Sequence, residues 1–285
     1  MKAFVTAWPK VSCSWINRLS VCLGKNFATS PRQLISTHDG KPFMMTRQKI
    51  PTLILSCEHA TNHLPDQYHP LITGCIDPLD THKGYDSGAL EFARLMAARL
   101  SAPLFAGSVT RLLVDLNRSL TNHRSPPIRS WSDLSFALKQ EILARYYHPY
   151  RRQVEEAIEG ILIKEKTVLH LSIHSFTPEL DGVQRTADVG FLYDPRRVEE
   201  KIFCEKWSTG LAARDVGWRV RRNYPYRGTS DGFVTALRKK FPTQCYLGIE
   251  LEINQIYPLD RKAAWPRLQH QLLESFVEVL QMQDK

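Results

Sequence analysis

The sequence predicts an α/β fold with a mixed, mostly parallel central sheet flanked by helices. After a joint rich in Pro and Gly at residues 38–43, short apolar runs alternate with helical patterns, and this alternation is typical of strands connected by helices. Several runs are continuously apolar, as expected of strands covered on both faces. With 285 residues, 43% of them hydrophobic and 24% charged, the chain can form one large globular domain.

Seven apolar runs are the candidate strands, because each is short, rich in aliphatic or aromatic residues and bounded by polar or turn-forming residues. In chain order they are TLILSC (52–57), APLFAG (102–107), RLLVDL (111–116), TVLHLSIHSF (167–176), DVGFLY (188–193), WRVRRN (218–223) and YLGIELEI (246–253).

Helical spacing of apolar residues predicts the helices. Leu90, Ala93 and Leu100 recur on one face of an amphipathic helix that we expect to cover the sheet. In a later segment Asp133 is a candidate N-cap and Pro149 a candidate break between one or two helices. The predicted helices span residues 87–100, about 133–166 and about 261–282.

We expect the chain to divide into an N-terminal extension, residues 1–45, and one main domain, residues 46–285. The first 38 residues contain five basic residues and no Asp or Glu, a composition typical of a transit peptide. A loose extension or a misassigned start codon has the same composition, and we favour either of these over a transit peptide. The six cysteines form no CxxC pair, which argues against a zinc ribbon or a secreted disulfide scaffold and favours a cytoplasmic location.

The positive net charge does not by itself indicate a nucleic-acid partner. The formal charge is +9, but without the five basic residues of the first 38 positions the chain holds 33 basic and 29 acidic residues, an excess of +4. No RNP motif, zinc-finger pattern or long basic run is present, and no apolar stretch approaches the roughly 18 residues of a membrane span. We expect no nucleic-acid partner, no membrane and a small anionic substrate.

Polar side chains stand at the ends of several predicted strands. Glu58 and His59 follow the first strand, and His174 and Glu252 end two later ones. In an open α/β sheet, ligands collect at the carboxyl ends of strands. Two histidines and a carboxylate are the usual ligands of a catalytic zinc that keeps an open position for water. The pattern predicts one Zn²⁺ per chain, with Glu252 as the free general base and proton shuttle.

Neighbouring residues have structural interpretations beside the functional ones. Asp86 precedes a helix and is, taken alone, more often an N-cap than a ligand. Arg118 can hold a substrate carboxylate through two hydrogen bonds, whereas Arg227 is equally a second carboxylate anchor or a surface arginine. We expect structural roles for His63, His82 and His170, and a supporting role for Glu250, which shares a strand face with Glu252.

Six ordered motifs resemble those of a known family. They are SCEHATNHLP, HKGYDSGA, RLLVDLNRSL, IHSFTP, NYPYRG and ELEINQ. Over residues 52–258 they resemble the N-formylglutamate amidohydrolase (N-formylglutamate deformylase) family. This resemblance implies a zinc-carboxypeptidase-like (phosphorylase/hydrolase-like) fold and metal-dependent hydrolysis of the linear amide bond of an N-acyl amino acid.

The resemblance also implies roles for single residues. The motif histidines fall on His59 and His174 as metal ligands, and the glutamate before Ile-Asn falls on Glu252. The DLNR motif is similar to the Asn-Arg pair with which related carboxypeptidase-like acylases hold a substrate carboxylate, which implicates Asn117 and Arg118.

The sequence does not identify the third metal ligand. Carboxypeptidases place a carboxylate three residues after the first histidine, where this chain has Asn62. We rank Asp86 first and Glu58 second for this role.

The predicted function is that of a zinc-dependent amidohydrolase that removes a formyl or similar small N-acyl group from glutamate or a related acidic amino acid. One alternative is a peptidase-like hydrolase of γ-glutamyl or other N-acyl amino acid bonds. The other is a catalytically silent anion-binding protein of the same fold.

Overall fold

The computed structural model describes residues 51–72, 79–121, 131–165, 167–214 and 217–282. The predicted N-terminal extension and the joint that follows it lie outside the described residues. No helix in the described ranges is long and apolar enough to cross a membrane.

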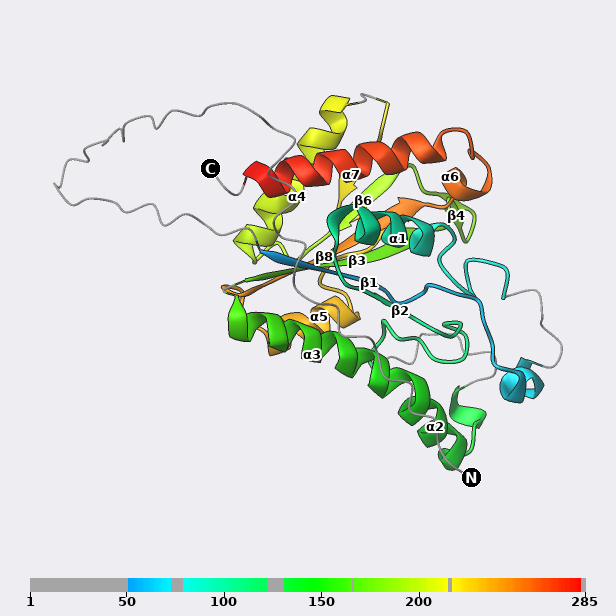
Figure 1. Ribbon diagram of the computed structural model, residues 1–285. Helices are drawn as coiled ribbons and strands as arrows, with labels where there is room; N and C mark the ends of the chain where they lie inside the picture. Colours follow the sequence, from blue (N-terminus) through cyan, green and yellow to red (C-terminus); the bar gives the residue numbers. More distant parts are fainter. Residues whose placement is uncertain (1–50, 73–78, 122–130, 166, 215–216, 283–285) are drawn as a thin grey trace, which may run out of the picture. The chain divides into compact units, whose positions relative to one another are not determined.

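A six-stranded sheet forms the centre of the described region (Figure 1). Its strands are β1 (Thr52–Cys57), β2 (Leu104–Ala106), β3 (Val168–Phe176), β6 (Val189–Leu192), β7 (Val220–Arg222) and β8 (Tyr246–Asn254), and a separate hairpin pairs β4 (Glu179–Leu180) with β5 (Val183–Gln184). The order in the sheet is β2–β1–β3–β8–β6–β7. Within this six-stranded sheet only the β6–β8 pair is antiparallel, so the predicted mixed, mostly parallel α/β sheet is confirmed.

Helices cover both faces of the sheet, as Figure 1 shows. The helices α1 (Ala89–Leu100), α4 (Val198–Arg214) and α7 (Trp265–Met282) pack on one face, and α3 (His148–Lys164) and α5 (Phe233–Lys240) pack on the other. The remaining helical segments are α2 (Phe136–Ile142), α6 (Ile256–Leu259), two 3-10 helices (Asp66–Ile72 and Trp131–Asp133) and a π-helical turn (Leu143–Tyr147).

The central strand β3 is buried along its whole length, but its two faces differ. Leu169, Leu171 and Ile173 belong to the apolar cluster that includes α1 and α7. Because side chains alternate along a strand, His170 and His174 lie on the opposite face, where His170 contacts Phe233 of α5. This face of β3 therefore carries polar side chains, of which His174 lies close to the carboxyl end of the strand.

The prediction of a strand at residues 111–116 is wrong. Its backbone forms turns, and Leu113 N donates to the carbonyl of Thr110 at 3.0 Å. Leu113, Val114 and Leu116 are buried in the apolar cluster that includes α3 and α5. The run is therefore apolar because it packs under helices, without a strand partner.

The helix-boundary predictions need two corrections. Ser135, and not Asp133, is the N-cap of α2, because its side chain accepts a hydrogen bond from Leu138 N at 3.2 Å. Pro149 lies in the first turn of α3, directly after the π-helical turn. The proline therefore marks a change of helical geometry and not a break.

Candidate metal centre and active-site pocket

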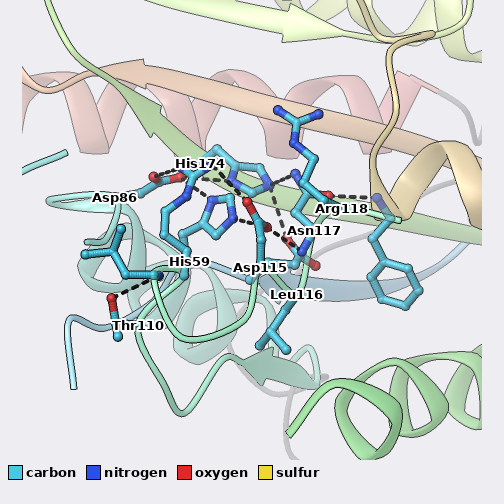
Figure 2. A network of polar contacts seen from close by, with 12 residues as sticks. His59, Asp86, Thr110, Asp115, Leu116, Asn117, Arg118 and His174 are labelled. Carbon is cyan, nitrogen blue, oxygen red and sulfur yellow. Dashed lines mark hydrogen bonds and ion pairs between the residues drawn. The ribbon is translucent and has the colours of Figure 1, made fainter. Parts of the chain in front are cut away.

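Three buried side chains converge where β1 and β3 end. His59 follows β1, His174 lies on β3, and Asp86 precedes α1. The Nδ1 atoms of His59 and His174 lie 3.3 and 2.9 Å from Asp86 Oδ2 (Figure 2), and the three residues are 3, 2 and 4% exposed. Imidazole nitrogen and carboxylate oxygen are the donors that zinc prefers. The cluster of His59, Asp86 and His174, called the triad below, can hold a metal ion.

Local backbone contacts place Asp86 in the triad. Its N–H donates to the carbonyl of His59 at 3.0 Å, and its own carbonyl accepts from Ala89 N at 3.1 Å. The N-cap of α1 is Gly88, with a φ of 79°, so Asp86 does not have the N-cap role. The backbone that leads to Asp86 passes close to Leu79 at Gly84. Only glycine fits there, because a Cβ would lie 2.1 Å from the carbonyl oxygen of Leu79.

A carboxylate that the sequence analysis missed lies behind His59. Asp115 Oδ1 is 2.8 Å from His59 Nε2, on the side of the ring away from Asp86 (Figure 2), and also accepts from Asn117 N at 2.9 Å. In metal-binding histidines the second ring N–H commonly donates a hydrogen bond to a carboxylate, which fixes the tautomer and the ring orientation. Asp115 is the first residue of the DLNR motif, and this position was the signal in the sequence that could have identified it.

Glu58 lies behind the other histidine. Its Oε2 is 3.1 Å from His174 Nε2 and accepts a hydrogen bond from Ser172 Oγ at 2.6 Å, and its Oε1 accepts from the hydroxyl of Tyr150 at 3.1 Å. Both histidines thus direct Nδ1 toward Asp86 and Nε2 toward a second carboxylate. This geometry favours Asp86 over Glu58 as the third ligand.

The electrostatics of the triad suit a cation. Burial alone would raise the pKa of Asp86, but the adjacent imidazoles of His59 and His174 hold it well below the ordinary value. The pKa of Asp115 is likewise held low against burial, by His59 and Arg111, and that of Glu58 by His174 and Ser172. The carboxylates are therefore ionised at neutral pH, and two ring nitrogens face the same point, so these residues fit a divalent metal ion.

The triad opens into a pocket that contains Glu252. Glu252 lies on β8 directly opposite His174 of β3. It is 5% exposed, and its Oε2 has no hydrogen-bond partner among the described residues. Burial raises the pKa of Glu252 to about 8. Gly190 is required beside it, because a Cβ there would lie 1.9 Å from the carbonyl oxygen of Tyr224.

Glu250 lines the same pocket and is 8% exposed. Burial also raises its pKa. The two glutamates therefore share one face of β8, as predicted from their spacing.

The three predicted substrate-binding residues all line this pocket. Asn117 is buried, and its Oδ1 accepts from Phe233 N at 2.7 Å, which ties the DLNR segment to the start of α5. Arg118 is half-buried, and its Nη1 donates to the carbonyl of Asp231. Arg227 is exposed.

Another polar residue that lines the pocket, Arg111, was not singled out from the sequence. Its Nη1 lies 3.5 Å from Asp86 Oδ1 and its Nη2 donates to Asp115 Oδ2 at 3.1 Å. It therefore contacts a triad carboxylate and the carboxylate behind His59 at once.

The remaining candidate residues lie outside the triad. His170 is fully buried, between the hydroxyl of Tyr246 and Ser56 Oγ, each 2.8 Å from a ring nitrogen. Asn62 donates to Asp80 Oδ1 at 2.6 Å. His63 and His82 are exposed.

A mostly parallel α/β sheet with a buried metal-competent cluster at its strand ends is an architecture suited to metal-assisted hydrolysis. The family model for N-formylglutamate amidohydrolase matches residues 51–257, which include the triad and Glu252. This chain therefore belongs to the N-formylglutamate amidohydrolase family.

Solved structures share the fold. The structure of gene product Atu2144 from Agrobacterium tumefaciens is 26% identical, with a TM-score of 0.69 over 82% of this chain and 92% of that chain. An N-formylglutamate amidohydrolase from Ralstonia eutropha JMP134 is 19% identical, with a TM-score of 0.58 over 82% of this chain and 94% of that chain. A comparison with curated proteins gave no match.

Proposed function

We propose that the protein is a zinc-dependent amidohydrolase that removes a formyl or similar small N-acyl group from glutamate or a related acidic amino acid. Membership of the family supports hydrolysis of a linear amide. The donor set of His59, Asp86 and His174 supports zinc, with one ion per chain. The observation that carries the proposal is the buried Oε2 of Glu252 in the same pocket, which has no hydrogen-bond partner within the part of the chain that the structure describes.

Glu252 is proposed as the group that moves the proton. When bound, the metal supplies a Lewis acid that polarises the amide carbonyl and acidifies water. Glu252 takes a proton from the attacking water, whose oxygen bonds to the acyl carbon, and gives the proton to the amine nitrogen as the C–N bond breaks. The products are the carboxylic acid and the free amino acid. A carboxyl whose pKa is raised by burial is suited to both proton transfers near neutral pH.

Cationic side chains are proposed to hold the substrate. Arg118 has further guanidinium donors beyond the one that bonds to Asp231, and it can pair with a carboxylate of the substrate. Arg227, at the exposed side of the pocket, can hold a second carboxylate. Asn117 supports this arrangement by anchoring the segment that carries Arg118.

A hydrolysis screen tests the proposal. Zinc-loaded full-length protein is incubated with N-formyl, N-acetyl and N-succinyl derivatives of glutamate and aspartate and with a γ-glutamyl dipeptide, and the released amine is measured. We expect hydrolysis of N-formylglutamate or a close analogue, and its loss in the Glu252→Gln variant. Hydrolysis of the γ-glutamyl dipeptide alone would replace the proposal with the peptidase-like function. Zinc binding without hydrolysis of any substrate would favour a silent anion-binding protein.

A further inference from the structure

Arg111 connects the two sides of His59. Its guanidinium lies 3.5 Å from Asp86 Oδ1 and 3.1 Å from Asp115 Oδ2. Asp86 faces Nδ1 of the His59 ring, and Asp115 faces Nε2. One planar side chain therefore joins a candidate ligand to the carboxylate that orients another candidate ligand.

The two oxygens of Asp86 have different partners. Oδ2 faces Nδ1 of His59 and of His174 and also accepts from Ser175 N at 3.3 Å. Oδ1 faces Arg111. If Oδ2 is the metal donor, Arg111 holds the other oxygen away from the ion, so Asp86 binds through one oxygen.

The number of carboxylate oxygens affects which metal a site prefers. Zinc favours four-coordinate sites with nitrogen donors. Larger cations that prefer oxygen, such as Mn²⁺, suit sites richer in carboxylate donors. A carboxylate limited to one oxygen therefore favours zinc over manganese.

The backbone around Arg111 is anchored to the segment that carries Asp86. Arg111 N donates to the carbonyl of Gly84 at 3.2 Å, and Thr110 Oγ1 donates to the same carbonyl at 2.8 Å. The Arg111 side chain is 24% exposed. Side chain and backbone thus hold the same segment from two points.

We propose that Arg111 is a positioning residue that holds Asp86 as a one-oxygen ligand, couples it to Asp115 and so sets the preference of the site for zinc over manganese. This inference rests on the proposed zinc centre, and it assigns Arg111 a role in metal choice that is separate from substrate binding.

The role of Arg111 is tested by measuring how tightly the full-length protein, first stripped of metal, binds Zn²⁺ and Mn²⁺. The dissociation constants for Zn²⁺ and for Mn²⁺ are measured by competition with a chromophoric chelator, for the unmodified protein, Arg111→Met and Arg111→Lys. Loss of a residue that orients a metal ligand typically weakens metal binding by about 10- to 100-fold. We expect a loss of this size for Zn²⁺ in Arg111→Met and a clearly smaller loss for Mn²⁺, so that the ratio of the two affinities changes.

Two further variants sharpen the result. Arg111→Lys should lie between the other two proteins, because one ammonium cannot span both carboxylates; it also carries the test if thermal unfolding shows that Arg111→Met does not fold. The matched control is Arg185→Met, which removes a half-buried cation whose guanidinium donates to the hydroxyl of Tyr226 in the same pocket and to the carbonyl of Thr177. We expect its metal preference to match the unmodified protein.

Three results would overturn the inference about Arg111. They are unchanged zinc binding in both Arg111 variants, equal losses for the two metals, and an equal change in Arg185→Met. Failure of the unmodified protein to bind zinc is a different result, because it would overturn the proposed zinc centre itself.

Discussion

His59 Nε2 lies 2.8 Å from Asp115 Oδ1, on the side of the ring opposite to Asp86. A hydrogen bond donated from Nε2–H to Asp115 would fix the tautomer in which Nδ1 can bind a metal. We expect Asp115→Asn to weaken zinc binding by about 10- to 100-fold, as measured by chelator competition. The control is Asp80→Asn, whose carboxylate is bonded to Asn62 outside the triad. Equal zinc affinities for Asp115→Asn and the control would show that the contact does not support the metal.

Arg118 is expected to act on substrate binding. Arg118→Lys keeps the charge but loses the planar fork that pairs with a carboxylate. A hydrogen bond to a charged group contributes about 1.5 to 3 kcal/mol, so KM should rise roughly 10- to 150-fold while kcat changes little. Steady-state kinetics on the best substrate of the screen measure both. An unchanged KM would leave Arg118 with a structural role, through its bond to Asp231.

His170 should make the stability of the protein depend on pH. Burial lowers its pKa from 6.5 to about 4, so between these values the unfolded chain binds a proton that the folded protein does not. The free energy of unfolding should therefore fall as pH is lowered through this window, by up to about 3 kcal/mol for this residue.

Urea unfolding of the metal-free protein from pH 7 to pH 4 measures this dependence. Other ionisable groups of the protein also titrate on acidification, so the informative quantity is the difference from His170→Gln, which cannot bind the proton. The variant should show the smaller loss of stability between pH 6.5 and 4. Parallel curves for the two proteins would contradict the assignment.

Much of the site follows from the sequence because parallel strands bring their ends together. His59 and His174 were assigned from their places after and on two apolar runs, and the structure pairs these runs as β1 and β3. Glu252 was assigned in the same way and lies opposite His174. Such positions are predictable because strand direction and side-chain alternation fix where a terminal residue points.

The residues that support the triad could not be found in this way. Asp115 and Arg111 lie in a segment whose apolar residues predicted a strand, but that segment is buried by packing under helices. Apolarity indicates burial and does not identify the partner that buries a segment. The contacts of Arg111 with Asp86 and Asp115 depend on how two loops pack together, and nothing local in the sequence specifies this.

Glu252 is expected to support catalysis without binding the metal. Glu252→Gln should keep the zinc content and the fold, because the triad supplies the donors, but it removes the proton transfer. Since general acid–base groups contribute about 10²- to 10⁴-fold, kcat should fall by that amount with little change in KM. Glu250→Gln is the matched control on the same strand face, and its effect should be much smaller. Loss of zinc from Glu252→Gln would make Glu252 a ligand instead.

The zinc content of the His59→Ala, His174→Ala double variant tests the metal centre most directly. Both side chains direct a buried ring nitrogen toward Asp86, and one carboxylate alone gives a poor zinc site. Elemental analysis of the purified, folded proteins should show one zinc per chain in the unmodified protein and almost none in the double variant. Full zinc occupancy in the double variant would contradict a zinc centre built on His59, Asp86 and His174.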